Sequence, residues 1–138
     1  MKEINKDVKK GSNMYGNTAH NIYAQNNTGI ESPIKLIEML YEGILRFNAQ
    51  AKKAIKDGDI EKKFYWTNRS IAIITELISV LDFEREENVS NYLNGLYNYQ
   101  IQLLSRAAAY HETEKIDECS NVFRTLLEAW RETNDLAN

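Results

Sequence analysis

From Ser32 onward, apolar residues keep a helical spacing almost without interruption. The chain of 138 residues has a single proline, Pro33, which stands where the first turn of a helix tolerates a missing backbone N–H. Beyond it, apolar residues recur at intervals of three and four, the spacing of one helix face. The first such set is Ile37, Tyr41, Ile44, Ala51 and Ile55. No strand pattern competes with this spacing, so the chain is predicted to be all-α.

The pattern divides into four helices separated by short links. Ser32 is expected to cap the first helix, and Asp57-Gly58-Asp59 to end it and cap the second, because glycine readily adopts a left-handed C-terminal turn. The expected ranges are about 33–57, 60–81, 87–110 and 114–135. Gly95, inside the third range, indicates close packing there. Long helices with short links predict an antiparallel four-helix bundle with an N-terminal arm or short extra helix.

The first 31 residues differ in composition from the rest. Residues 1–13 are rich in lysine and nearly without apolar side chains. One interpretation of Gly11-Ser12 before Met14 is a cloning junction, in which case this polar extension is not native and Met14 is the natural start. Residues 14–31 are rich in Asn, Gln, Thr and Gly. We expect residues 14–31 to form a mobile N-terminal arm and residues 32–138 to form the helical bundle.

Composition argues against several classes of protein. A formal charge of -3 and an isoelectric point near 5.5 argue against nucleic-acid binding, which usually needs a basic domain. No apolar run approaches the roughly 18 residues of a membrane-spanning helix, and residues 1–13 lack the apolar region of a signal peptide. The one cysteine excludes an internal disulfide framework and fits a reducing cytosol. We therefore expect a cytoplasmic protein without membrane insertion.

Patterns that carry chemistry are missing from the sequence. There is no glycine-rich phosphate loop, and the two histidines, His20 and His111, do not form the Glu-x-x-His pairs of a bundle metal site. Cys119 is interpreted as a small helix residue without chemistry, and His111 as a surface or link residue. The sequence thus predicts a protein that is not an enzyme, with no cofactor and no metal. Metal analysis and a cofactor absorbance scan test this expectation.

Apolar and aromatic residues exceed what one bundle seam needs. The second helix has a seam containing Ile71, Ile74 and Ile78, and a second stripe lies on another side of the same helix. One interpretation is that this stripe belongs to the core and margin of the bundle. The other is that it forms part of a groove for another protein's apolar helix. On the second interpretation the partner-binding residues are Tyr65, Trp66, Ile73, Leu77 and Val80.

The segment Ser32 to Phe47, SPIKLIEMLYEGILRF, resembles the first-helix signature of the flagellar secretion chaperone FliS family. Residues 19–26 resemble the family's arm motif of two tyrosines three apart followed by Asn. Tyr23 and Asn26 match this motif, whereas His20 replaces the first tyrosine. Supporting matches occur in the family's order at Asp59 to Lys62, Thr75 to Asp82, Leu96-Tyr97 and Leu127 to Trp130. Glu86-Glu87 departs from the Gly-Gly that the family often has at the second link.

The resemblance implies the role of the family. FliS proteins are cytoplasmic, mostly helical export chaperones that bind the C-terminal segment of flagellin and prevent premature polymerisation. They assist its delivery to the type III export apparatus, where the export gate protein FlhA is the docking partner. No cofactor is implied. The alternative that composition alone leaves open is a helical adaptor or interaction module of another assembly.

The resemblance also gives the arm a role. It implies that Ile22, Tyr23 and Asn26 take part in covering an apolar pocket of the free chaperone and in recognition by the export gate. Ile22 and Tyr23 are neighbouring apolar residues in a segment too polar to fold alone. The simpler alternative is that this pair packs on the bundle as a lid and does nothing else.

Overall fold

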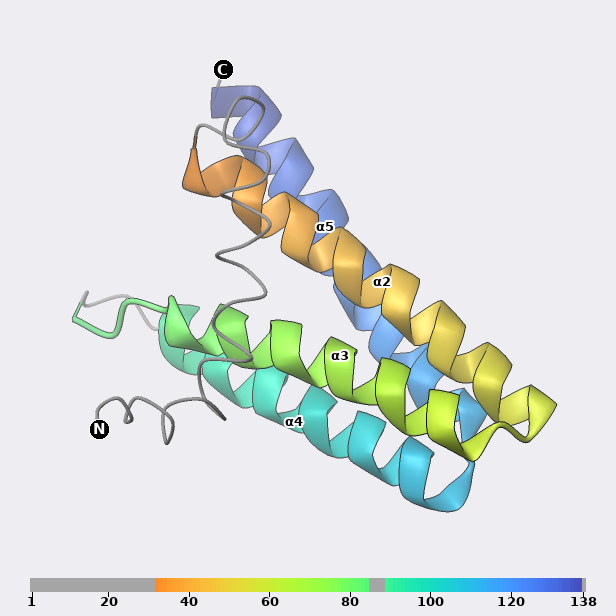
Figure 1. Ribbon diagram of the computed structural model, residues 1–138. Helices are drawn as coiled ribbons and strands as arrows, with labels where there is room; N and C mark the ends of the chain where they lie inside the picture. The colour runs from red at the N-terminus through yellow and green to blue at the C-terminus, as the bar shows by residue number, and fades with distance from the viewer. Residues whose placement is uncertain (1–31, 85–88, 138) are drawn as a thin grey trace, which may run out of the picture.

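Four long helices form the described part of the chain in a computed structural model, which describes residues 32–84 and 89–137 (Figure 1). They are α2 (Pro33–Asp57), α3 (Ile60–Ser79), α4 (Val89–Tyr110) and α5 (Thr113–Ala137). Within these two ranges there is no strand, and the all-α prediction is confirmed. Helix α3 ends two residues earlier than expected. The structure describes α4 from Val89, two residues after the expected start. The expectations for residues 1–13, for the arm and for Glu86-Glu87 concern residues outside the described ranges.

Each helix packs against two neighbours: α2 against α3 and α5, and α4 against the same two. Consecutive helices run in opposite directions, and so do α2 and α5, which confirms the antiparallel bundle (Figure 1). The links α2–α3 and α4–α5 lie together at one end, which we call the linked end (Figure 1). Toward the other end, the α2–α5 pair diverges from the α3–α4 pair; we call this the open end.

The predicted caps of α2 and α3 are confirmed. Ser32 Oγ accepts a hydrogen bond from the Lys35 backbone N–H at 3.4 Å, and Asp59 Oδ1 accepts one from the Lys62 N–H at 3.0 Å. Gly58 adopts the left-handed conformation with φ of 72°, and its N–H donates to the carbonyls at the end of α2. Such caps satisfy backbone groups that a helix leaves unpaired.

Replacing Ser32 by Ala is expected to lower the free energy of unfolding by about 1 kcal/mol, because the first turn of α2 loses its side-chain acceptor. Ser105→Ala serves as the control, since Ser105 lies exposed within α4, where Ala is the better helix former. Urea unfolding of the two variants beside the wild type measures the difference. Equal stability of Ser32→Ala and the wild type would show that the cap contributes nothing.

Helix α4 ends in the same type of turn as α2, but without glycine. His111 has φ of 59°, and the Glu112 N–H donates to the Ala107 carbonyl at 3.1 Å. A residue with a Cβ occupies this left-handed region at a cost of roughly 1–2 kcal/mol. His111 is exposed and lies in the link, as the sequence predicted.

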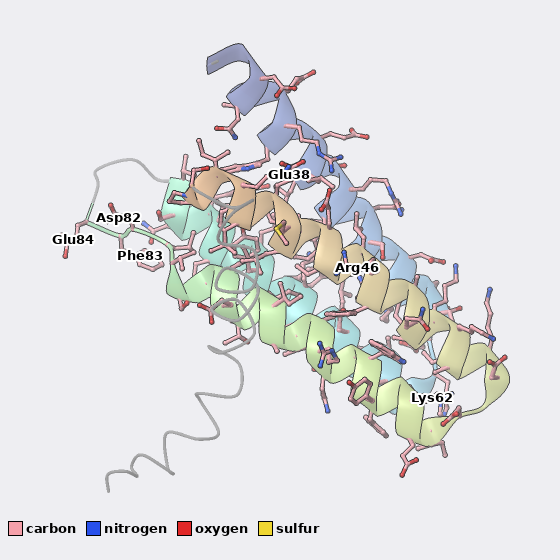
Figure 2. All side chains as sticks on the ribbon, turned by 45° about the horizontal axis from the view of Figure 1, so that its top comes forward. Glu38, Arg46, Lys62, Asp82, Phe83 and Glu84 are labelled. Carbon is pink, nitrogen blue, oxygen red and sulfur yellow. The ribbon has the colours of Figure 1, made fainter. Side chains whose placement is uncertain are left out.

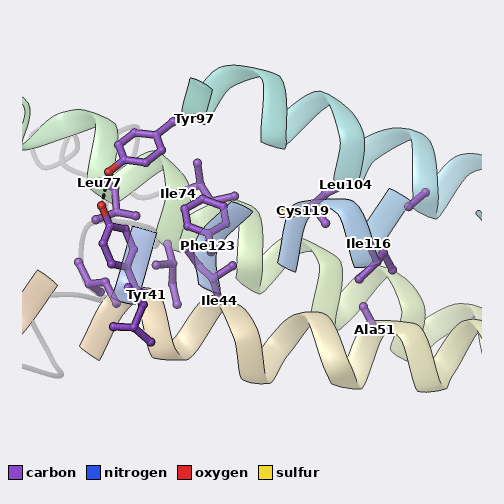
Figure 3. Close-up of a cluster of buried hydrophobic side chains, with 14 residues drawn as sticks. Tyr41, Ile44, Ala51, Ile74, Leu77, Tyr97, Leu104, Ile116, Cys119 and Phe123 are labelled. Atoms are coloured by element: carbon purple, nitrogen blue, oxygen red, sulfur yellow. Dashed lines mark hydrogen bonds between the residues drawn. The ribbon is translucent and has the colours of Figure 1, made fainter. Parts of the chain in front are cut away.

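The core is centred on Phe123 of α5, which is fully buried (Figure 3). Its ring stacks on Tyr97 of α4 at a centroid distance of 6.0 Å and packs at a tilt against Tyr41 of α2 at 5.8 Å. Aliphatic residues of all four helices complete the cluster, among them Ile44, Ile74, Leu104 and Ile116. The three rings therefore join α2, α4 and α5 through the centre of the bundle.

A buried polar cluster lies beside this core. Asn48 of α2 donates through Nδ2 to Ser120 Oγ at 3.1 Å and to Cys119 Sγ at 3.5 Å, both on α5. Ser70 of α3 donates through Oγ to Asn48 Oδ1 at 2.7 Å. Burial raises the pKa of the Cys119 thiol to about 12. The thiol therefore stays protonated at neutral pH. The thiolate, which is the nucleophilic form of cysteine, does not form there.

Close packing occurs at a different glycine from the one expected. A Cβ added at Gly43 of α2 would lie 2.9 Å from Ile73 Cδ1 of α3, so the two helices meet tightly there. A Cβ added at Gly95 would meet no atom within 4 Å, and the residue is exposed. The prediction of close packing at Gly95 is therefore wrong.

Candidate binding pocket at the open end

An apolar pocket opens where the two helix pairs diverge. Its volume is about 330 Å³, and all four helices contribute to its lining. The apolar lining includes Leu36, Ile37 and Leu40 of α2, Leu77, Val80 and Leu81 at the end of α3, Leu93 of α4 and Trp130 of α5. Because the walls come from both helix pairs, their separation sets the width of the pocket. We call this cavity the open-end pocket.

Two tyrosines form the inner part of the open-end pocket. The hydroxyls of Tyr41 and Tyr97 lie 2.7 Å apart and share a hydrogen bond, although both side chains are buried (Figure 3). Burial raises the pKa of both phenols. Each hydroxyl thus has its partner inside the protein and does not need water.

Side chains of α2 and α5 join at the rim. The Trp130 indole N–H donates to the Ile34 carbonyl at 2.9 Å, and Arg131 pairs with Glu38 at 2.6 Å and with Glu42. Glu38 lies between the two helices in Figure 2. The hydrogen bond from Arg131 lowers the pKa of the Glu38 carboxyl. These contacts hold α2 and α5 together as one pair beside the pocket.

The structure divides the predicted partner-binding residues into three groups. Val80 is 54% exposed and lines the open-end pocket together with Leu77. Leu77 and Ile73 are each 1% exposed and belong to the core. For Ile73 and Leu77 the burial favours the first interpretation of this stripe, in which it belongs to the core of the bundle. The reason is that α3 packs against both α2 and α4, so it needs two apolar stripes to fill its contacts.

Tyr65 and Trp66 lie on a separate surface nearer the linked end. Trp66 is half-buried against Phe47 of α2 at a centroid distance of 5.5 Å, and Tyr65 packs edge-on against it at 4.8 Å. The Arg69 guanidinium lies 4.9 Å from the Phe47 ring centroid and 5.5 Å from that of Tyr65. Arg46 lies 5.7 Å from the Phe47 ring centroid and is labelled on α2 in Figure 2. The five predicted residues thus do not form one continuous surface.

Several pocket residues were missed by the partner-binding prediction. Leu36, Leu93 and Trp130 are half-buried residues that line the open-end pocket. The signal for Leu36 was present, because the apolar stripe of the first helix is wider than one face. Nothing in the spacing identifies Trp130 as a pocket residue. The predicted arm residues Ile22, Tyr23 and Asn26 lie outside the described residues.

Metal-binding clusters and membrane-spanning helices are absent from the described ranges. There, no group of three or more His, Cys, Asp or Glu side chains is placed to hold a metal ion. None of the described helices is both long enough and apolar enough to cross a bilayer. The arrangement at the open end can bind apolar side chains, and the fold and this pocket define a helical-bundle binding protein.

Comparison with known proteins gives the family. The family model described as flagellar protein FliS matches residues 15–137. The flagellar secretion chaperone FliS of Campylobacter jejuni is 54% identical over 122 residues, covering 88% of this chain and 95% of that one. The one from Salmonella typhimurium is 29% identical over 128 residues, with the same two coverages. The chain belongs to the FliS family of flagellar secretion chaperones, and the resemblance seen in the sequence is confirmed.

A solved structure agrees with the fold. The crystal structure of a flagellar chaperone from bacteria superposes with a TM-score of 0.70 at 19% identity, covering 86% of this chain and 96% of that one. At this identity the likeness shows the fold alone. The family is one of chaperones and not of enzymes, which favours a chaperone over an adaptor of an unrelated assembly.

Proposed function

We propose that this chain is a cytoplasmic export chaperone that binds the C-terminal segment of flagellin. Binding prevents premature polymerisation and assists delivery to the flagellar type III secretion apparatus. Membership of the FliS family and the names of its relatives, flagellar secretion chaperones, support the proposal. A flagellar export substrate is the partner that such a name implies.

The observation that carries the proposal is the open-end pocket with its apolar walls. A disordered client with amphipathic repeats loses conformational entropy when it folds on a partner, so it needs an apolar surface to offset that cost. Leu77 and Val80 are the two originally predicted residues that line this pocket. Tyr65 and Trp66 provide a second apolar surface, which a long client can reach while it occupies the pocket.

Mixing the full chain with a peptide of the flagellin C-terminal segment tests this function. Size-exclusion chromatography is expected to show a complex, and calorimetry a saturable binding isotherm with a negative heat-capacity change from apolar burial. A peptide of the same composition in scrambled order is the control. Equal binding of the two peptides, or no binding of either, would contradict the proposal.

Delivery requires a second partner, and we assign this to the export gate protein FlhA. The arm residues Ile22, Tyr23 and Asn26 are proposed to cover the open-end pocket in the empty chaperone. Flagellin displaces the arm, which then contacts FlhA. This is a population shift, so flagellin must bind the uncovered state more tightly than the covered one.

Replacing Tyr23 by Ala is expected to weaken docking of the flagellin-loaded chaperone on the FlhA cytoplasmic domain. Flagellin binding itself should be unchanged or slightly tighter, because the competing arm has lost its aromatic side chain. Titration of the loaded chaperone against FlhA, with wild type and variant side by side, measures the effect. Tyr15→Ala, earlier in the same arm, is the matched control. Equal affinities of Tyr23→Ala and wild type for FlhA would remove the arm from recognition.

A further inference from the structure

A second pocket lies at the linked end, about 30 Å along α2 from the open-end pocket. Its volume is about 320 Å³. The lining is mostly apolar and includes Ala54, Ile55 and Ile60, with Asp59, Lys63 and His111 as its ionisable residues. We call it the linked-end pocket. Neither the family comparison nor the proposed function gives it a role.

The feature that sets this pocket apart is a buried lysine. Lys63 is 3% exposed, whereas lysine is almost never fully buried unless it is paired. Its ammonium lies 3.3 Å from His111 Nδ1 and 4.4 Å from the centroid of the Phe64 ring. In the two described ranges, no carboxylate forms an ion pair with it. The ammonium therefore has N–H donors to spare, and no carboxylate of the described ranges lies within ion-pair distance of it.

His111 holds the other side of this contact. An ammonium group has no lone pair, so Lys63 donates and the imidazole Nδ1 must accept. The imidazole holds this position on a backbone with φ of 59°, where Gly58 occupies the corresponding place at the end of α2. Such strain outside glycine often accompanies a functional contact. The strained turn presents the imidazole to Lys63 at the wall of the pocket.

We propose that the linked-end pocket binds a carboxylate carried on a short apolar group. Lys63 supplies the positive charge, and Ala54, Ile55 and Ile60 contact the apolar part. The single ammonium group favours a singly charged ligand, because a phosphate dianion needs more hydrogen-bond donors than one ammonium gives. Asp59 does not oppose binding strongly. Its carboxylate accepts from the Lys62 N–H and lies at the positive end of α3, which offsets its charge.

The first test compares Lys63→Met with Lys62→Met. Methionine keeps the length of the side chain and removes the charge, so without ligand Lys63→Met should unfold at a higher temperature than the wild type. Lys62 is exposed at the linked end, as Figure 2 shows, and its substitution should leave the midpoint almost unchanged. A charge retained at a cost in stability is expected where it binds a ligand. A lower midpoint for Lys63→Met would show that the charge is stabilised within the chain and would overturn the proposal.

The second test adds sodium butyrate, with butyramide as the uncharged probe of the same shape. Calorimetry of the full chain should show saturable butyrate binding that is at least about tenfold weaker in Lys63→Met and unchanged in Lys62→Met. Butyramide should not bind. The proposal would be overturned if both variants lost butyrate binding, or if both kept it. Binding of butyramide as tight as that of butyrate would also overturn it.

A spectroscopic measurement on the wild type does not depend on the folding of any variant. Butyrate at constant pH and ionic strength should shift the ring resonances of His111 saturably. An acetylated Ala-Ala-Val peptide with a free C-terminus, compared with its C-terminal amide, identifies the source of the carboxylate. Binding of the free peptide points to the end of a protein chain, and binding of butyrate alone points to a small organic acid. An unmoved His111 resonance with both butyrate and the free peptide would contradict the proposal.

Discussion

Ile73→Glu is expected to unfold the protein, whereas Val80→Glu is expected to leave its helicity and melting nearly intact. Ile73 is 1% exposed and packs tightly against Gly43 of α2, and burying a carboxylate there costs several kcal/mol. That cost is a large part of the 5–15 kcal/mol that stabilises a typical domain. Val80 is 54% exposed at the end of α3, so a carboxylate there stays in water. Circular dichroism during thermal unfolding separates the two outcomes.

The same pair tests the open-end pocket. Val80→Glu should weaken binding of the flagellin C-terminal peptide by about tenfold or more, because the charge must leave water when the client covers it. Thr75→Glu, exposed on α3 and outside the pocket lining, is the matched control and should bind normally. A folded Val80→Glu protein with normal affinity would remove Val80 from the binding surface. A folded Ile73→Glu protein would show that the core assignment is wrong.

The tyrosine pair at the base of the open-end pocket is expected to lower the stability of the protein strongly at high pH. Burial raises the pKa of Tyr41 and Tyr97, whereas unfolded tyrosines lose their protons near pH 10. Above pH 10 the unfolded state therefore binds fewer protons than the folded state, and stability falls as pH rises toward the folded pKa values. Each tyrosine contributes a slope of up to about 1.4 kcal/mol per pH unit in this window.

Comparison with Tyr41→Phe/Tyr97→Phe isolates this effect. The double variant should lose less stability between pH 9.5 and about 11 in urea unfolding, because its two phenols no longer titrate. Cys119, with its raised pKa, adds to the alkaline loss in both proteins and cancels in the comparison. Parallel pH profiles of the two proteins would show that the tyrosines do not contribute.

At neutral pH, the single variant Tyr41→Phe gives a further control. It leaves the buried Tyr97 hydroxyl without its partner and should cost about 1–3 kcal/mol. The double variant removes both polar groups and should be closer to the wild type.

Local features of the sequence predicted the helices well because their causes are local. Ser32, Gly58 and Asp59 act within one turn of the chain, and each occupies the cap position expected for it. The predicted end of α3 was less accurate, since no glycine or proline marks where the helix stops at Ser79. Spacing also shows that α3 has two apolar stripes, but it does not show which neighbour each stripe contacts.

The open-end pocket follows from causes that spacing does not contain. It lies where the α2–α5 and α3–α4 pairs diverge (Figure 1), and the packing between helices involves residues far apart in the sequence, such as Gly43 and Ile73. Trp130 reaches the pocket through a hydrogen bond to Ile34, which lies 96 residues earlier. The linked-end pocket likewise joins Lys63 to His111 from different halves of the chain. Single-helix periodicity contains no information about such pairs.

The buried Asn48 cluster limits how the two helix pairs can move against each other. Sliding α2 by one turn along α3 or α5 would separate Asn48 from Ser70 and Ser120 and leave its amide unpaired in the core. Asn48 therefore fixes the axial register of α2 against both α3 and α5, and the bundle keeps one alignment of its helices along their length.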